Sequence, residues 1–435
     1  MRNEEQKGDD ERAVVLLRPL RGEPAGPSAV DVPRAMAEGS RRRRLRRWSS
    51  GVAMAAVTAL AVSGGSVAAT ALTRRDDPQP APSMTASAGA PASAGVPASA
   101  GVTASAGVGR PVAVAPTDCT VTRLPTGGVE KALVTGGDPS GRYLVGRLYP
   151  AAGQDAKKRV VLWKDGKIAA YPALAGADAS LEDVTTDGIA VGSSFDGADR
   201  YGWVYRDGLL WRLAGGTGEA RSINEDRVIV GSLGGVLDRV PARWNGMTAE
   251  PVRLRLPDGA TGGSADYIGA DGTIAGTAGA EAGNESGVLW LPDGTMRVMP
   301  LPTVDGRRAD FFWPESIVGD TVAGRAVFET AEIRERTFVA MTYSIAGGGY
   351  REVAGNVGLR SYAAANGWVA GFAGMDDAKP AIVAGETVVR LPLYREQREY
   401  VLSSLSADGK VLGGYSTDGF TNGEVRNLPL MWTCR

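Results

Sequence analysis

The 435-residue chain has no histidine and only two cysteines, Cys119 and Cys434, which narrows the chemistry open to its side chains. Without histidine there is no Ser-His-Asp or Cys-His nucleophile and no histidine-ligated zinc or copper. A zinc site made of cysteine alone needs more than two of them. We therefore expect no catalytic residue of these kinds, no metal site and no bound cofactor.

Carboxylates are the remaining candidates for catalysis, and many lie in segments that follow recurring glycines. Charges of both signs alternate in these segments, which is typical of solvated loops, and that is our interpretation of them. The charged residues are Asp155, Lys157, Lys158, Asp196, Asp199, Arg200, Asp238, Arg239, Glu281, Glu285, Glu332, Arg334, Asp376, Asp377 and Asp418. No calcium site is expected at Asp196-Gly197-Ala198-Asp199, which lacks the third carboxylate of a dedicated loop. A hydrolase or lyase with paired carboxylates remains an alternative, since a sequence does not give their separations.

The charged segments follow a sequence repeat that recurs along the chain. Each copy has a turn of Asp-Gly or similar type, two or three apolar residues and a glycine, and successive glycines are 39 to 48 residues apart. The seven glycines are Gly146, Gly192, Gly231, Gly276, Gly324, Gly371 and Gly413. This period is the length of one four-stranded β-propeller blade.

A second pattern follows most of the glycines. It is an apolar run that ends in an aromatic residue and a tight turn, as in Trp163-Lys164-Asp165-Gly166 and Trp244-Asn245-Gly246. Such turns join antiparallel strands, and no helical periodicity accompanies them. We predict an all-β fold, a seven-bladed β-propeller over about residues 119–435.

The two ends of the repeat region complement each other. The seventh repeat stops after a third strand, at Leu430-Met431-Trp432-Thr433-Cys434-Arg435, whereas Cys119-Thr120-Val121-Thr122-Arg123 resembles an isolated fourth strand. We predict that the N-terminal strand completes the seventh blade. On this alignment both cysteines fall at the hairpin turn of other blades, so we predict a disulfide, which an oxidising compartment allows. Two unrelated free thiols are the alternative.

Aromatic residues divide into two groups. Trp163, Trp244, Trp290 and Trp432 recur at one blade position, and we assign them to the core between blades. Trp313, Trp368 and Phe372 depart from this pattern and are our candidates for ligand recognition at the surface.

Arginines recur on the predicted fourth strands, where charge prevents edge-to-edge association. A rim that binds a polyanion is the alternative. These residues are Arg123, Arg212, Arg253, Arg297 and Arg390.

The segment Ser222-Ile223-Asn224-Glu225-Asp226-Arg227-Val228-Ile229-Val230-Gly231, with Ala242-Arg243-Trp244-Asn245-Gly246 after it, resembles the HAF-type repeats of bacterial extracellular proteins. The resemblance covers about residues 120–435 and is strongest in the second to fourth repeats. It implies a β-propeller and no particular chemistry. The order of tail, apolar span, linker and repeats is also similar to that of actinobacterial single-pass membrane proteins.

The N-terminal region predicts a membrane anchor. Residues 1–47 form a polar tail, predicted to be mostly disordered, that ends in Arg41, Arg42, Arg43, Arg44, Arg46 and Arg47. Residues 48–73 carry no charge, and 52–72 are the most apolar, which is long enough for a transmembrane helix. The arginine run indicates a cytoplasmic N-terminus and can bind anionic membrane lipid.

A cleaved export signal is the alternative to this anchor. Ala69-Thr70-Ala71 fits a cleavage site, and Ser40-Arg41-Arg42 with Leu45 loosely resembles a twin-arginine signal. Both interpretations place the remainder outside the cytoplasm. Residues 74–116, in which Ala-Ser-Ala-Gly occurs four times, are predicted to be a flexible linker before the propeller of 117–435.

The part of the chain after residue 75 is mildly acidic, which gives no support for nucleic-acid binding. We predict a protein of the cell membrane that holds a non-catalytic propeller outside the cytoplasm. The propeller would bind or sense a protein, peptide or cell-envelope ligand through its loops, and no enzyme activity is predicted. A structural propeller that organises the envelope is the second alternative, beside the carboxylate hydrolase or lyase.

Overall fold

The computed structural model describes residues 114–151, 158–235, 238–281, 284–330, 336–355, 361–373, 379–395, 399–421 and 424–435. Every regular element in these ranges is a β-strand. The predicted tail, span and linker of residues 1–113 lie outside the described residues. Where the chain is described, it contains no helix with the length and apolar character needed to cross a bilayer.

Seven four-stranded antiparallel sheets form the blades, each ordered from an inner to an outer strand. Blade 1 has β2 (Lys131–Gly137), β3 (Tyr143–Tyr149), β4 (Val160–Lys164) and β5 (Lys167–Ala170). Blade 2 has β6 (Ala177–Val184), β7 (Ala190–Asp196), β8 (Asp199–Arg206) and β9 (Leu209–Arg212). Blade 3 has β10 (Gly218–Ile223), β11 (Ile229–Leu233), β12 (Val240–Trp244) and β13 (Pro251–Arg253). Blade 4 has β14 (Gly262–Ile268), β15 (Ile274–Gly279), β16 (Ser286–Trp290) and β17 (Met296–Val298).

The remaining blades are less uniform. A small hairpin, β18 (Thr303–Val304) and β19 (Arg307–Arg308), precedes blade 5. Blade 5 has β20 (Phe311–Val318), β21 (Thr321–Glu329), β22 (Arg336–Ser344) and β23 (Tyr350–Glu352). Blade 6 has β24 (Tyr362–Ala363), β25 (Trp368–Ala373), β26 (Lys379–Ala384) and β27 (Thr387–Arg390). Blade 7 has β28 (Glu399–Leu405), β29 (Val411–Thr421), β30 (Glu424–Cys434) and, as its outer strand, β1 (Cys119–Arg123).

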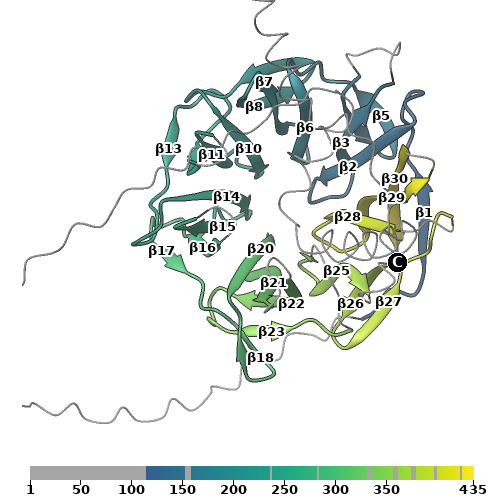
Figure 1. Cartoon of the computed structure of the whole chain (residues 1–435). Coiled ribbons are helices and arrows are strands. Elements are labelled where there is room, and N and C mark those ends of the chain that lie inside the picture. Colours follow the sequence, from purple (N-terminus) through teal and green to yellow (C-terminus); the bar gives the residue numbers. More distant parts are fainter. Residues whose placement is uncertain are drawn as a thin grey trace, which may run out of the picture. The chain divides into compact units, whose positions relative to one another are not determined.

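The blades form a closed ring (Figure 1). Each blade contacts the next in sequence, for example β3 with β6, β11 with β14 and β25 with β28. Blade 7 contacts blade 1 through β2 against β29 and β30, which closes the circle. The prediction of a seven-bladed all-β propeller is confirmed.

The closure of blade 7 is also confirmed. β1 pairs antiparallel with β30, and Cys119 stands opposite Cys434 as the first pair of the register. The two form a disulfide with a Cα–Cα distance of 4.1 Å. In blade 1 the corresponding places belong to the turn residues Gly166 and Asp165, so the sulfur bridge stands where other blades have a covalent turn.

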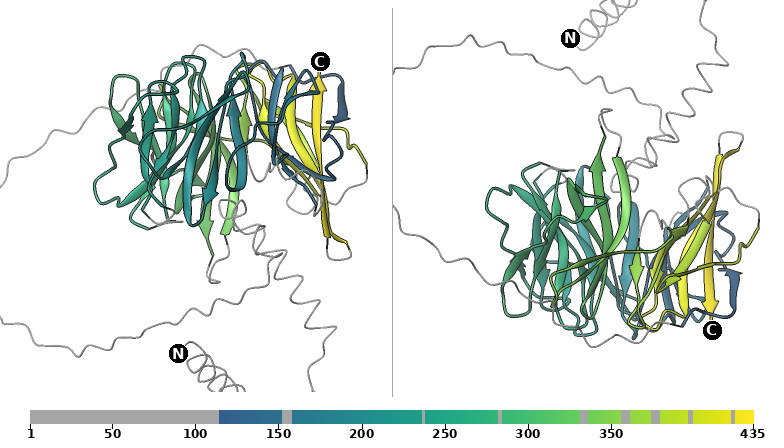
Figure 2. Two further views of the ribbon diagram at one scale, coloured as in Figure 1. Left: turned by 90° about the horizontal axis from the view of Figure 1, so that it is seen from above. Right: turned by 90° about the horizontal axis from the view of Figure 1, so that it is seen from below.

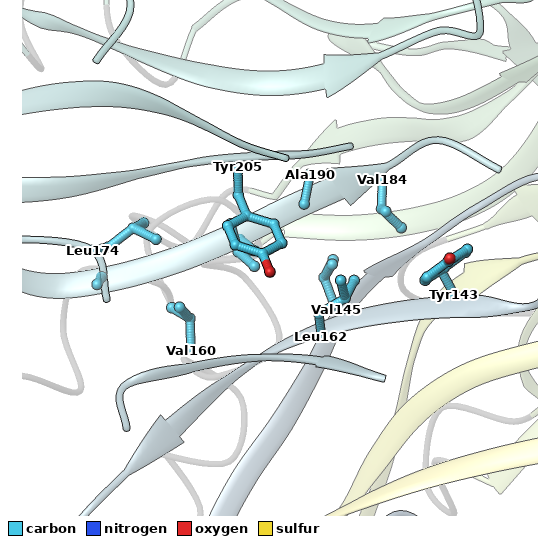
Figure 3. Packing of buried hydrophobic residues seen from close by; sticks show 10 residues of the cluster. Tyr143, Val145, Val160, Leu162, Leu174, Val184, Ala190 and Tyr205 are labelled. Carbon is cyan, nitrogen blue, oxygen red and sulfur yellow. The ribbon is translucent and has the colours of Figure 1, made fainter. Parts of the chain in front are cut away.

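Apolar side chains fill the spaces between blades. Figure 3 shows one such cluster, in which Val145 and Leu162 of blade 1 pack against Leu174, Ala190 and Tyr205 of the neighbouring blade 2 region. The recurring tryptophans are buried, as predicted. In addition, each indole Nε1 donates a hydrogen bond to a carbonyl that follows the outer strand of the preceding blade. These bonds are Trp163 to Pro125, Trp244 to Ala214, Trp290 to Arg255 and Trp432 to Pro392, at 2.7 to 3.0 Å.

Antiparallel strands divide the connections between two faces of the propeller. We call the turn face the one with the tight turns from first to second and from third to fourth strands, such as 138–142 and 165–166. The loop face carries the connections from second to third strands and from blade to blade. Cys434 ends its strand on the turn face. Figure 2 shows the β21–β22 and β29–β30 hairpins extending past the other strands on the opposite side. The strands of these hairpins are 9 and 11 residues long.

Candidate functional site

A β-bulge recurs at one level of the inner strands. In six blades the pairing of the inner strand with its neighbour skips one residue. A bulge re-aims the side chain of the residue that it leaves unpaired. All six skipped residues are polar: Thr135, Glu182, Arg221, Asp266, Glu315 and Ser403.

The recurring glycine of the sequence repeat lies directly opposite this bulge. Gly192 pairs with Leu181, beside the skipped Glu182, and Gly231 pairs with Ala220, beside the skipped Arg221. A Cβ atom at either glycine would overlap the backbone carbonyl oxygen of the inner strand. The most regular feature of the sequence thus marks the place where the inner strand bulges.

Several bulge residues bind the next blade. The Ser403 hydroxyl donates to the Val134 carbonyl at 2.7 Å, and the Thr135 hydroxyl donates to the Leu181 carbonyl. The Glu315 carboxylate accepts the Ser361 backbone N–H at 2.6 Å. At these bulges a side chain of one blade therefore forms a hydrogen bond with the backbone of the next blade.

Charged side chains link blades 2, 3 and 4 around Glu219, which is 3% exposed. Its carboxylate forms ion pairs with Arg200 of blade 2 and, at 3.1 Å, with Arg221 of its own strand. Arg221 also lies 3.9 Å from Asp266 of blade 4. Burial alone would raise the pKa of Glu219, but Arg221, Arg200 and the nearby Arg239 lower that pKa to about 2. The carboxylate is therefore ionised at any physiological pH.

Further ion pairs extend this arrangement to neighbouring seams. Arg147 of blade 1 pairs with Asp178 of blade 2. Arg239 binds both oxygens of the Glu285 carboxylate across the seam of blades 3 and 4, at 3.1 and 3.2 Å. We call these residues the inter-blade ion network: Arg147, Asp178, Arg200, Glu219, Arg221, Arg239, Asp266 and Glu285. A separate buried pair, Arg325 with Glu315 at 3.0 Å, lies within blade 5.

Asp183 adds a titratable group to the seam of blades 2 and 3. Its Oδ2 accepts hydrogen bonds from the Ser222 hydroxyl at 2.6 Å and the Ile223 backbone N–H at 3.0 Å. Its Oδ1 accepts the N–H of Val184 at 2.9 Å. Burial raises the pKa of Asp183 to about 6, against the hydrogen bonds, which lower it. At the equivalent seam of blades 5 and 6, a serine, Ser316, accepts the N–H of Ala363.

The interpretation of Arg200, Arg239 and Glu285 as solvated loop charges is wrong, because all three belong to the ion network. The bulge residues Glu182, Arg221, Asp266 and Glu315 were missed altogether. A signal for them exists in the sequence. A polar residue stands 9 to 11 positions before the repeat glycine in each of the six bulged blades.

The surface-recognition candidates are wrong, because the structure buries all three. Trp313 is 7% exposed, and its Nε1 donates to the Glu285 carbonyl at 2.9 Å. Its ring lies 5.2 Å from the Arg325 guanidinium and 5.4 Å from that of Arg336. Trp368 is 7% and Phe372 is 4% exposed. Departure from the repeat does not mean exposure here, since both faces of every blade are covered by its neighbours.

The arginine run at residues 41–47 lies outside the described part of the chain, so its role as a topology signal stays a prediction. Within the described ranges, no group of three or more Cys, Asp or Glu side chains is arranged to hold a metal ion. The ion network joins acids to guanidinium groups instead. The ion network holds neighbouring blades in a fixed register.

Comparison with known proteins shows no family for this chain. No model of a known protein family matches the chain, and no curated protein matches it. The HAF-type resemblance therefore stays a prediction.

Three solved structures that are similar to this chain are the following. TolB of Acinetobacter baumannii is 15% identical with a TM-score of 0.36, over 55% of this chain and 63% of its own. An acylaminoacyl peptidase of Pyrococcus horikoshii is 13% identical with a TM-score of 0.43, over 70% and 53%. A gluconolactonase of Xanthomonas campestris is 11% identical with a TM-score of 0.35, over 74% and 96%. The chain thus spans under two thirds of the first two proteins, and its assignment as a propeller rests on its own seven sheets.

Proposed function

We propose that the chain is a membrane-anchored protein whose propeller stands outside the cytoplasm and binds a protein, peptide or cell-envelope ligand at its loop face. The observation that carries the proposal is that the chain enters the propeller on one face and the two longest hairpins project from the other. The chain enters β1 beside Arg435 on the turn face, where Thr117 bonds to the last residue. The loop face, with the long β21–β22 and β29–β30 hairpins, is therefore the face opposite the one at which the described chain begins.

A binding role is supported over a catalytic one by the state of the inner carboxylates. General acid catalysis needs a carboxyl with a pKa near the working pH and access to a substrate. Glu219 is held ionised by three arginines. Asp183 has a suitable pKa, but both of its oxygens accept hydrogen bonds within a blade seam. These carboxylates serve the ring rather than a substrate.

Proximity labelling from the propeller in intact cells tests the proposal. The full chain would be compared with a variant in which β29–β30 is shortened to the Ser416–Leu428 pair and closed by an Asn-Gly turn. Asp207→Asn is the matched control, because Asp207 lies in a tight turn on the other face and its side chain is 82% exposed. We expect the shortened hairpin to lose labelled partners that the control keeps.

Two results would reject the proposal. One is a propeller that an added protease cannot reach in intact cells, which would place it inside. The other is an identical set of labelled partners from both variants.

A further inference from the structure

The last residues before β1 are fastened to the ring at several points. Thr117 donates from its backbone N–H and from its hydroxyl to the Arg435 carbonyl, at 2.9 and 3.3 Å. Arg435 in turn donates its N–H to the Asp118 carbonyl at 2.9 Å. The pairing between the start and the end of the propeller thus continues beyond the disulfide, to Thr117 and Arg435.

A further contact reaches a different blade. The indole Nε1 of Trp368, in blade 6, donates to the backbone carbonyl of Val114 at 3.0 Å. Val114 is 82% exposed, and the contact is made to its backbone carbonyl. Residues 114–118 are therefore tied to blade 6 as well as to the end of blade 7.

The disulfide occupies the position in β1 that a pull through the preceding chain would load first. β1 is five residues long, and Cys119 is its first residue. Force that arrives along residues 114–118 passes into Cys119 before it reaches the pairs from Thr120 to Arg123. Without a covalent bond, hydrogen-bonded pairs at the loaded end of so short a strand would break one after another.

We propose that residues 114–119, Trp368 and the Cys119–Cys434 disulfide form a load-bearing junction that keeps blade 7 closed when the preceding chain is under tension. The disulfide passes the pull into β30, the central strand partner of β1, and so protects the β1–β30 pairing from it. This property goes beyond the proposed function, because it concerns how the ring resists force and does not depend on the ligand.

The position of the bond within the strand distinguishes load bearing from simple ring closure. Arg123 and Leu430 form the pair at the far end of β1. A disulfide there would close the ring over nearly as long a loop, and the entropic stabilisation depends only weakly on loop length. It would leave the pairs from Cys119 to Thr122 open to a pull.

Magnetic tweezers on the full chain test the proposal. One handle is placed at the N-terminus and the other on a tag inserted after Gly197, in a loop-face turn where a Cβ atom would meet nothing within 4 Å. Under oxidising conditions we expect no opening of β1 before the propeller unfolds, because only the contacts of residues 114–118 lie outside the disulfide. With a reductant, or in the Cys119→Ser/Cys434→Ser variant, we expect a step on the order of 20 Å, the extended length of a five-residue strand, followed by loss of the ring at lower force.

The relocated bond, Arg123→Cys with Leu430→Cys in the double-serine background, should show the opening step but keep the ring closed after it. The proposal is overturned if oxidised and reduced wild-type protein open at the same force, or if the relocated bond suppresses the step as the native one does. The comparison of oxidised and reduced wild-type protein decides the matter even if the relocated variant does not fold.

Discussion

Cys119 and Cys434 are 315 residues apart in the chain and stand opposite each other as the first pair of β1 and β30. They take the places of a glycine and an aspartate in the tight turn of an ordinary blade. The link between the third and fourth strands of blade 7 is therefore made by sulfur rather than by backbone. Blade 7 therefore depends on one disulfide to join its third and fourth strands, whereas in the other six blades the backbone joins them.

Removing the bond should destabilise the propeller. We expect Cys119→Ser/Cys434→Ser to lower the free energy of unfolding by about 2–5 kcal/mol, because the unfolded chain loses a constraint over a very long loop. Urea unfolding of the oxidised protein and of the variant measures this difference. Thr433→Ser, a change at an exposed neighbour in the same strand, is the control. Equal urea midpoints for the variant and the control would show that backbone pairing alone closes blade 7.

Asp183 should make the stability of the propeller depend on pH between about 4 and 6. Its pKa rises from an ordinary 3.8 to about 6 in the folded protein. Below pH 3.8 the Asp183 carboxyl is protonated in both the folded and the unfolded state, so its ionisation adds no cost to folding. As pH rises through 6, the folded state must hold an ionised carboxylate that burial disfavours, at a cost of about 3 kcal/mol.

Asp183→Asn removes that charge and keeps an acceptor for the Ser222 hydroxyl and the Ile223 N–H, but it loses the bond from Val184. We expect the substitution to stabilise the protein by about 1–2 kcal/mol at pH 8 and to be neutral or destabilising at pH 4. Thermal unfolding at the two pH values is the measurement. A substitution effect that is the same at both would mean that Asp183 titrates at its ordinary pKa.

The parts of this molecule that could be predicted from sequence are those that leave a periodic or paired mark along the chain. The repeat glycine is one, because the bulge opposite Gly192 or Gly231 leaves no room for a Cβ atom. The orphan strand at Cys119 is another, since a ring with an unmatched third strand at Trp432 needs a fourth from elsewhere.

The members of the ion network that lie in connections could not be predicted in the same way, because a charged residue in a connection looks alike in sequence whether it meets water or a buried partner. Arg239 and Glu285 lie 46 residues apart and meet only because two blades stack. The prediction that Trp313 lies at the surface was wrong for a related reason. Its position outside the regular core pattern was visible in the sequence, but the neighbouring blade that covers it was not.

Glu219→Gln should be among the most destabilising single changes in the inner strands. It leaves Arg200 and Arg221 partly buried without their carboxylate, which typically costs about 3–5 kcal/mol. Glu281→Gln, at an exposed loop position, is the matched control and should have little effect.

The contribution of Glu219 should also fade in acid. Its pKa falls from an ordinary 4.5 to about 2 in the folded protein, so the stabilisation is complete above 4.5 and is lost as pH falls toward 2. From these values we expect the wild-type advantage of about 3 kcal/mol at neutral pH to fall to roughly half at pH 3. Urea titrations of both variants at pH 7 and pH 3 measure it. An advantage that does not change with pH would show that Glu219 stabilises the blades by packing rather than by charge.

The recurring tryptophans should matter for their indole nitrogen as well as for their size. Trp290 is 5% exposed and donates to the Arg255 carbonyl at 2.7 Å, which ties blade 4 to the end of blade 3. Trp290→Phe removes the donor, leaves that carbonyl without this partner and opens a small cavity, so we expect a loss of about 2–3 kcal/mol in stability. Trp211→Phe, on the outer strand β9 where the ring is only partly buried, should cost clearly less. Calorimetric unfolding of the two variants compares them, and equal losses would mean that the inter-blade hydrogen bond contributes nothing beyond the burial of an aromatic ring.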